Sequence, residues 1–142
     1  MRSTIKIFAA VLGLLVTAVA GPAFADPCEA PLPSQAGAEF SGVVRYVVDG
    51  DGLCVGPASG GGATWIEVRL MDFDAPELRQ PGGEEARQTL RRLVFGRRVD
   101  CVVTPGRRGT TTSYDRTHAV CRLGGRRVGD LMRAAGVTEG GN

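Results

Sequence analysis

Acidic residues gather at two places near the middle of the chain, and one arginine, Arg69, lies shortly before the second place. The acidic residues of the two places are Asp49 and Asp51, and then Asp72, Asp74 and Glu77. Several oxygen ligands without a nearby histidine or free thiolate suit a hard cation such as Ca²⁺. If Asp51, Asp74 and Glu77 converge near Arg69, their mutual repulsion favours a cation between them. A cation beside an arginine is typical of a site that handles phosphate.

Extended segments are expected to position these carboxylates. Val47 and Val48 lead into Asp49-Gly50-Asp51-Gly52, whose glycines would allow the positive φ angles of a tight hairpin, and residues 53–55 resume the extended pattern. Residues 65–71 mostly alternate between apolar and polar, as a strand with one wet face does. In this interpretation Glu67 and Asp72 face solvent. The alternative reading of Asp49 and Asp51 is that they only form the turn.

Three motifs carry a resemblance to a known family. The segments VVDGDG and RLMDFDAPE, followed by Tyr114-Asp115-Arg116, resemble the thermonuclease (staphylococcal nuclease-like) family in order and spacing, over roughly residues 41–136. The resemblance implies a mainly β fold with helices (α+β), an OB-fold five-stranded barrel with two short helices. It also implies Ca²⁺-dependent hydrolysis of DNA and RNA.

The resemblance also implies roles for single residues. Asp51 and Asp74 would be direct metal ligands, and Ala75 would offer its backbone carbonyl. Glu77 would be the general base that activates water, with Asp49 in the outer metal shell.

The same resemblance assigns the phosphate to two arginines. Arg69 and Arg116 would hold it and stabilise the charge of the transition state. Tyr114 would stack on a base or sugar, the alternative being an ordinary rim tyrosine. The chain departs from the family pattern at Gly52 and Ala75, where threonine is usual, and at Asp115, where glycine is usual.

The first 25 residues have the pattern of a secretory signal peptide. Arg2 and Lys6 precede an apolar run over residues 7–20, and Ala23-Phe24-Ala25 forms a cleavage site. A membrane anchor is the alternative, but a spanning helix needs about 20 apolar residues. We therefore expect residues 1–25 to be removed and the protein to be secreted or periplasmic, with no membrane attachment afterwards.

The chain has four cysteines, Cys28, Cys54, Cys101 and Cys121. In an exported chain they indicate two disulfides with three possible pairings, and the lack of CxxC spacing disfavours metal binding. The barrel that the family resemblance implies would bring Cys101 close to Cys121. Cys28 would then pair with Cys54 and tie the N-terminal arm to the second strand.

The remaining chain predicts one small domain. We expect an irregular arm over residues 26–40, the nuclease-like domain over residues 41–137 and a frayed tail over residues 138–142. An apolar stripe predicts a helix over residues 84–95, and a second short helix is expected over residues 128–135. Residues 26–77 are acidic and residues 78–142 are rich in arginine, which could steer a polyanion or be ordinary solvated surface.

The sequence thus predicts an exported monomer that is a calcium-dependent nuclease with little sequence specificity. DNA and RNA would be its substrates. The alternative is a non-catalytic OB-fold module that binds single-stranded nucleic acid or a protein partner.

Overall fold

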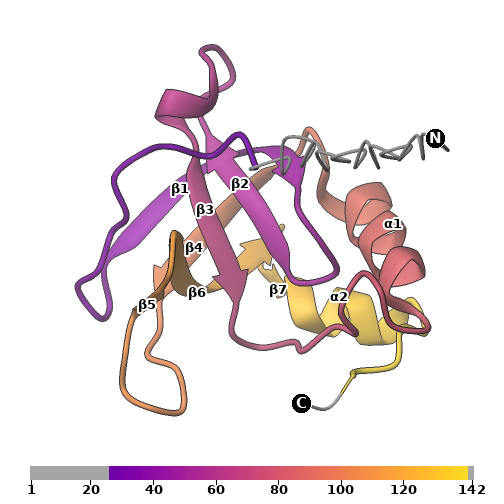
Figure 1. Cartoon of the computed structure of the whole chain (residues 1–142). Coiled ribbons are helices and arrows are strands. Elements are labelled where there is room, and N and C mark those ends of the chain that lie inside the picture. Colours follow the sequence, from indigo (N-terminus) through magenta and orange to yellow (C-terminus); the bar gives the residue numbers. More distant parts are fainter. Residues whose placement is uncertain (1–25, 141–142) are drawn as a thin grey trace, which may run out of the picture.

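Five strands close into a barrel in the computed structural model, which describes residues 26–140 (Figure 1). The barrel strands are β1 (Glu39–Val47), β2 (Gly52–Gly56), β3 (Ile66–Leu70), β4 (Arg98–Val103) and β6 (Arg116–Leu123). The order is β3-β2-β1-β4-β6, and the parallel pairing of β3 with β6 closes the ring. The other neighbouring pairs of the barrel are antiparallel. This is the α+β, OB-type barrel that we expected. The expected signal peptide lies outside the described residues.

Two helices accompany the barrel and lie next to each other (Figure 1). Helix α1 (Gly83–Val94) and helix α2 (Val128–Ala134) agree with the predicted helices to within one residue at each end. Ala86, Leu90 and Val94 of the predicted stripe are fully buried. Three short elements complete the fold: the 3-10 helix η1 (Gly62–Thr64), β5 (Thr112–Ser113) and β7 (Arg126–Arg127). No helix within residues 26–140 is long and apolar enough to span a bilayer.

Two disulfides tie the strands and the N-terminal arm together. Cys101 on β4 is bonded to Cys121, its register partner on β6, and Cys28 in the arm is bonded to Cys54 on β2. These are the pairings that the family resemblance implied. Each closes a loop of 20 to 26 residues, for which a stabilisation of about 3 kcal/mol is typical.

The glycines of the β1–β2 turn serve a different purpose from the one expected. Neither Gly50 nor Gly52 is among the glycines with positive φ in residues 26–140. A Cβ on Gly50 would instead lie 2.4 Å from the Cβ of Ala75 and 2.7 Å from that of Ala86. Glycine is therefore required because the turn packs directly against the segment after β3 and against α1.

Both ends of the domain differ from the sequence interpretation. Strand β1 begins at Glu39, inside the expected arm, because Glu39 and Phe40 pair with β4. Residues 138–140, expected in a frayed tail, are held against the segment after β3. The Gly140 N–H donates to the Asp74 carbonyl at 3.0 Å, and the Asp74 N–H donates to the Glu139 carboxylate at 3.1 Å.

Candidate functional site

Arg69 lies between two carboxylates that are far apart in the sequence. Its Nη2 is 3.2 Å from Oδ2 of Asp51 and 2.6 Å from Oδ1 of Asp74. The hairpin register explains this contact, because Gly52, next to Asp51, pairs with Arg69 across β2 and β3. Nη1 of Arg69 donates to the carbonyl oxygens of Leu70 and Phe73, which fixes the guanidinium where β3 ends.

Asp51 is the buried member of this group, with 6% of its surface exposed. Its Oδ2 accepts a 2.6 Å hydrogen bond from the Ala75 N–H, and its own N–H donates to Oδ1 of Asp49 at 3.0 Å. Burial raises the pKa of Asp51 to about 7, with Arg69 lowering it and the Asp49 charge raising it. The arginine alone therefore leaves the Asp51 charge only partly compensated.

A small pocket of about 220 Å³ opens beside Arg69 and Asp74. Met71, Ala75, Arg107 and Gly140 complete its lining. Arg107 comes from the loop between β4 and β5, and its exposed Nη2 lies 3.7 Å from Oδ2 of Asp74. The sequence analysis did not assign Arg107 to the site, and the signal available was its place in a polar loop beside Arg108. The pocket thus carries a second guanidinium.

The donor types at Asp51 and Asp74 suit a hard cation, although within residues 26–140 neither residue belongs to a converging group of three or more ligating side chains. Asp51 and Asp74 supply carboxylate oxygens, and the adjacent Ala75 has a backbone carbonyl. These are oxygen donors of the kind that Ca²⁺ prefers. The incomplete compensation of Asp51 agrees with a binding site for positive charge.

The structure does not bring every expected site residue to the two carboxylates of Asp51 and Asp74, which we call the Asp51–Asp74 pair. Glu77 is exposed, and its backbone N–H donates to Oε1 of Gln80. Within residues 26–140 no hydrogen bond or ion pair joins the Glu77 carboxylate to Asp51, Asp74 or Arg69.

Arg116 has other partners than the Asp51–Asp74 pair. Its guanidinium lies 3.8 Å from Oδ2 of Asp49 and 3.8 Å from Oε1 of Glu67. Asp49 therefore contacts both the Asp51 backbone and Arg116. Because Asp51 also contacts Arg69, Asp49 and Asp51 together connect the two arginines of the expected site. Tyr114 is 97% exposed and has a φ of 54°, so its ring is open to solvent beside Arg116.

Glu67 and Asp72 correct the sequence interpretation, because neither faces solvent freely. Glu67 is only 3% exposed. Asp72 is half-buried and its Oδ2 accepts a 3.0 Å hydrogen bond from the Gly129 N–H in α2. Burial raises the pKa of Asp72, and this hydrogen bond opposes the shift. Asp72 therefore joins α2 to the segment after β3.

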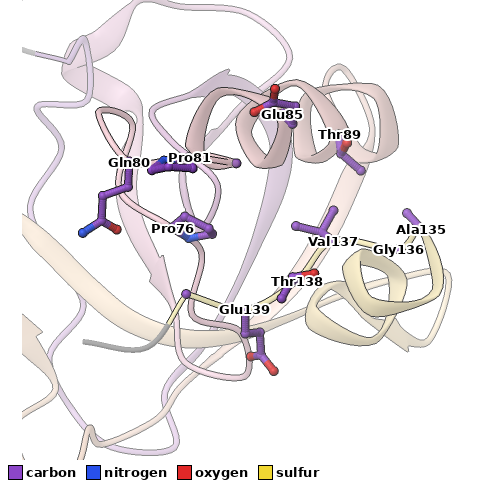
Figure 2. Close-up of a pocket in the computed structure, with 12 residues that line it drawn as sticks. Pro76, Gln80, Pro81, Glu85, Thr89, Ala135, Gly136, Val137, Thr138 and Glu139 are labelled. Carbon is purple, nitrogen blue, oxygen red and sulfur yellow. The ribbon is translucent and has the colours of Figure 1, made fainter.

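A larger pocket, of about 710 Å³, lies between α1 and the segment that follows α2, and Gly140 lines both this pocket and the small one (Figure 2). Pro76, Thr89 and Val137 are among the residues that line it. Glu85 and Glu139 are its titratable lining residues. Glu139 is engaged by Arg133, with Oε1 2.9 Å from Nη2. This pocket brings together no group of acids, bases or nucleophiles that indicates catalysis.

His118, on β6, is a structural residue. It is 8% exposed, its Nδ1 lies 2.8 Å from the Thr110 carbonyl and its Nε2 lies 2.9 Å from Oγ of Ser113. Since a carbonyl only accepts, Nδ1 carries the proton and Nε2 accepts from the serine in the neutral ring. Both nitrogens are thus used to hold the loop before β5.

Comparison with known proteins identifies two relatives. The chain is 46% identical over 66 residues to Protein ParB of Escherichia coli, covering 46% of this chain and 35% of that protein. It is 35% identical over 99 residues to Micrococcal nuclease of Shigella flexneri, covering 70% of this chain and 47% of that protein. The chain thus matches about a third of the first relative's length and about half of the second's. No protein-family model matches the chain.

Proposed function

We propose that this protein is a calcium-dependent nuclease that hydrolyses phosphodiester bonds of DNA and RNA with little sequence specificity. The observation that carries the proposal is the position of Arg69 between Asp51 and Asp74 at the edge of a pocket. The similarity to a protein named micrococcal nuclease supports it. The motifs at residues 46–52, 69–77 and 114–116 have the order and spacing that resemble the thermonuclease family.

Asp51, Asp74 and the carbonyl of Ala75 would hold the ion, with Asp49 in its outer shell. When bound, Ca²⁺ would supply Lewis-acid polarisation of the phosphate. The hydrogen bond from the Ala75 N–H orients the carboxylate of Asp51, one of the proposed ligands, and thereby supports this assignment.

The chain's own side chains would perform the remaining steps. Glu77 takes a proton from water, the water oxygen forms a bond to phosphorus, and the bond from phosphorus to the 5′ oxygen breaks. The products are a 3′-phosphate and a 5′-hydroxyl that takes its proton from solvent. Arg69 and Arg116 bind the phosphate and offset the charge that builds in the transition state. Tyr114 supplies a stacking surface for a base or sugar.

Further parts of the proposal concern where the protein works. Removal of residues 1–25 would release residues 26–142, whose nuclease-like domain, residues 41–137, would act as a monomer in the secreted or periplasmic space. The two disulfides support this location, because such bonds persist in oxidising compartments. The arginines of residues 78–142 would attract the polyanionic substrate.

The test is degradation of DNA and RNA by the wild-type chain and by Glu77→Gln, each with Ca²⁺ and with a chelator. We expect activity only for the wild type with Ca²⁺ and a loss of at least about 100-fold for Glu77→Gln. Glu29→Gln is the matched control, since Glu29 is exposed and lies in the N-terminal arm. Equal rates in all samples would contradict the proposal.

A second candidate is a non-catalytic OB-fold module that binds single-stranded nucleic acid or a protein partner. The observation in its favour is that Arg116 contacts Asp49 and Glu67 and that Glu77 lies apart from the Asp51–Asp74 pair. Binding without turnover, unchanged by Ca²⁺ or chelator, would select this candidate.

A further inference from the structure

Three carboxylates outside the Asp51–Asp74 pair converge at one point. Asp26, Glu67 and Asp115 each present one oxygen, and these oxygens all lie within 4.8 Å of one another. The residues come from the N-terminal arm, from β3 and from the turn before β6. Local sequence does not place them together, so the tertiary fold must.

The disulfide and the barrel register assemble the cluster. Cys28 is bonded to Cys54, and Cys54 is the register partner of Glu67 on β3, so the arm is fixed beside this strand. In Figure 1 the indigo arm crosses β2 and β3 at one end of the barrel. On the other side of β3, the parallel pairing of Val68 with Thr117 places the start of β6 next to Glu67. Asp115 immediately precedes that strand.

Glu67 is the buried centre of the cluster. It is 3% exposed, and its Oε2 is buried without a hydrogen-bond partner among the described residues. A buried carboxylate oxygen without a partner is destabilising, because it has lost its hydrogen bonds to water and gained no donor in return. A bound ion would remove that destabilisation, because it would coordinate this oxygen directly.

The local charge is strongly negative. Arg116 is the guanidinium beside the cluster, and it divides its contacts between Glu67 and Asp49 at 3.8 Å each. This guanidinium is therefore shared between Glu67 of the cluster and Asp49 outside it. The pKa of Glu67 is raised to about 8, first by burial and then by the charges of Asp26 and Asp115, while Arg116 lowers it. Glu67 is therefore short of neighbouring positive charge, and its Oε2 also lacks a hydrogen-bond partner among the described residues.

We propose that Asp26, Glu67 and Asp115 form a second, structural site for a hard divalent cation such as Ca²⁺, which fastens the N-terminal arm to the barrel. Calcium–oxygen distances are about 2.3–2.6 Å, so one ion reaches oxygens that are up to about 5 Å apart. The oxygens of the cluster meet this limit. Cys28 and Cys54 lie near Asp26 but are joined in a disulfide, which leaves no thiolate for a soft metal.

The ligands of this site differ from those of the proposed nuclease site, although Arg116, which contacts Glu67, is also proposed to bind the phosphate. The test therefore uses an Asp51→Asn/Asp74→Asn chain, in which the proposed nuclease site lacks both carboxylate ligands. Calcium titration calorimetry of this chain should give one bound ion, and calcium should raise its melting temperature by binding the folded state. Adding Glu67→Gln should weaken binding by at least about tenfold and remove the rise in melting temperature.

Two further variants test the same cation site independently of Glu67. Asp115→Asn alters an exposed ligand, so it tests the site even if Glu67→Gln fails to fold. Glu29→Gln, in the same arm and exposed, is the matched control and should bind as the parent does. The proposal is overturned if the Asp51→Asn/Asp74→Asn chain binds no calcium, or if Glu67→Gln and Asp115→Asn bind it as the parent does. Loss of nuclease activity would not bear on this result, because the parent chain already lacks that site.

Discussion

The backbone N–H of Ala75 donates a 2.6 Å hydrogen bond to the carboxylate of Asp51, although the two residues are 24 positions apart. This bond joins the two acidic segments of the sequence into one group. Arg69 lies against the same oxygen of Asp51, at 3.2 Å, and thereby connects it to Asp74. The hydrogen bond between Ala75 and Asp51 therefore holds the two acidic segments together in one candidate ion site.

Arg69 is predicted to act in opposite directions on activity and on calcium affinity. Arg69→Ala should abolish nuclease activity, because the phosphate loses its guanidinium. It should also tighten calcium binding, because a positive charge leaves the Asp51–Asp74 pair. Without calcium it should lower the free energy of unfolding by about 1–3 kcal/mol, since Asp51 loses its partner.

Nuclease assays, calcium titration and chemical denaturation with chelator check these three outcomes. Arg79→Ala is the control, because Arg79 is exposed and lies in the loop before α1. Unchanged activity in Arg69→Ala would contradict the role proposed for this arginine.

Gly50→Ala should destabilise the fold and impair the site together. The new methyl would lie 2.4 Å from Cβ of Ala75 and 2.7 Å from Cβ of Ala86, and neither neighbour has a flexible end that could move away. We expect a loss of about 1–3 kcal/mol in the free energy of unfolding and weaker calcium binding through the displaced turn. Denaturant unfolding of Gly50→Ala and Gly61→Ala provides the comparison. A Cβ on Gly61 would have no atom within 4 Å, so equal losses in both variants would argue against the packing explanation.

The stability of the chain with chelator should fall as pH rises, and Glu67 should account for part of that fall. The pKa of Glu67 is raised from its ordinary value of 4.5 to about 8, mainly by burial, so the folded state holds this proton more tightly than the unfolded state. The resulting stabilisation is complete below pH 4.5 and is lost as pH rises toward 8. Glu67→Gln should therefore flatten the curve of unfolding free energy against pH in this window. Identical curves for the variant and the wild type would refute this assignment, and Glu29→Gln should follow the wild type.

The disulfide between Cys28 and Cys54 should matter more for the arm than for the proposed nuclease site. Cys28→Ser/Cys54→Ser should cost about 2–4 kcal/mol of stability and weaken the calcium site that contains Asp26. Nuclease activity below the melting temperature should be retained, because within residues 26–140 no hydrogen bond or ion pair joins Asp51, Asp74 or Arg69 to the arm. Melting curves, calcium titration of the Asp51→Asn/Asp74→Asn background and nuclease assays measure the three effects. Retained calcium binding in that background would contradict the role given to the disulfide.

The sequence determined the local elements, because their signals lie within a few residues of each other. The stripe of Ala86, Leu90 and Val94 predicted α1, and Gly96, which has a φ of 74°, ends it as a glycine after a helix does. Alternation predicted the strand that carries Arg69, and turn residues predicted the turn that carries Asp51. Family-like motifs then implied the barrel and the cysteine pairs.

Only the tertiary structure decided which side chains meet. It buried Glu67, which alternation had placed in solvent, because closure of the barrel between β3 and β6 and the disulfide-bound arm cover it. It placed Arg116 against Asp49 and Glu67, brought Arg107 to Asp74 and held Glu139 against the Asp74 backbone. These contacts join segments that are distant in the sequence. The burial of a carboxylate, its repulsion by other carboxylates and its lack of a hydrogen-bond donor arise only when barrel closure brings such segments together. For that reason the sequence indicated which residues could take part in chemistry. The fold decided which residues neighbour them and how those neighbours shift their protonation.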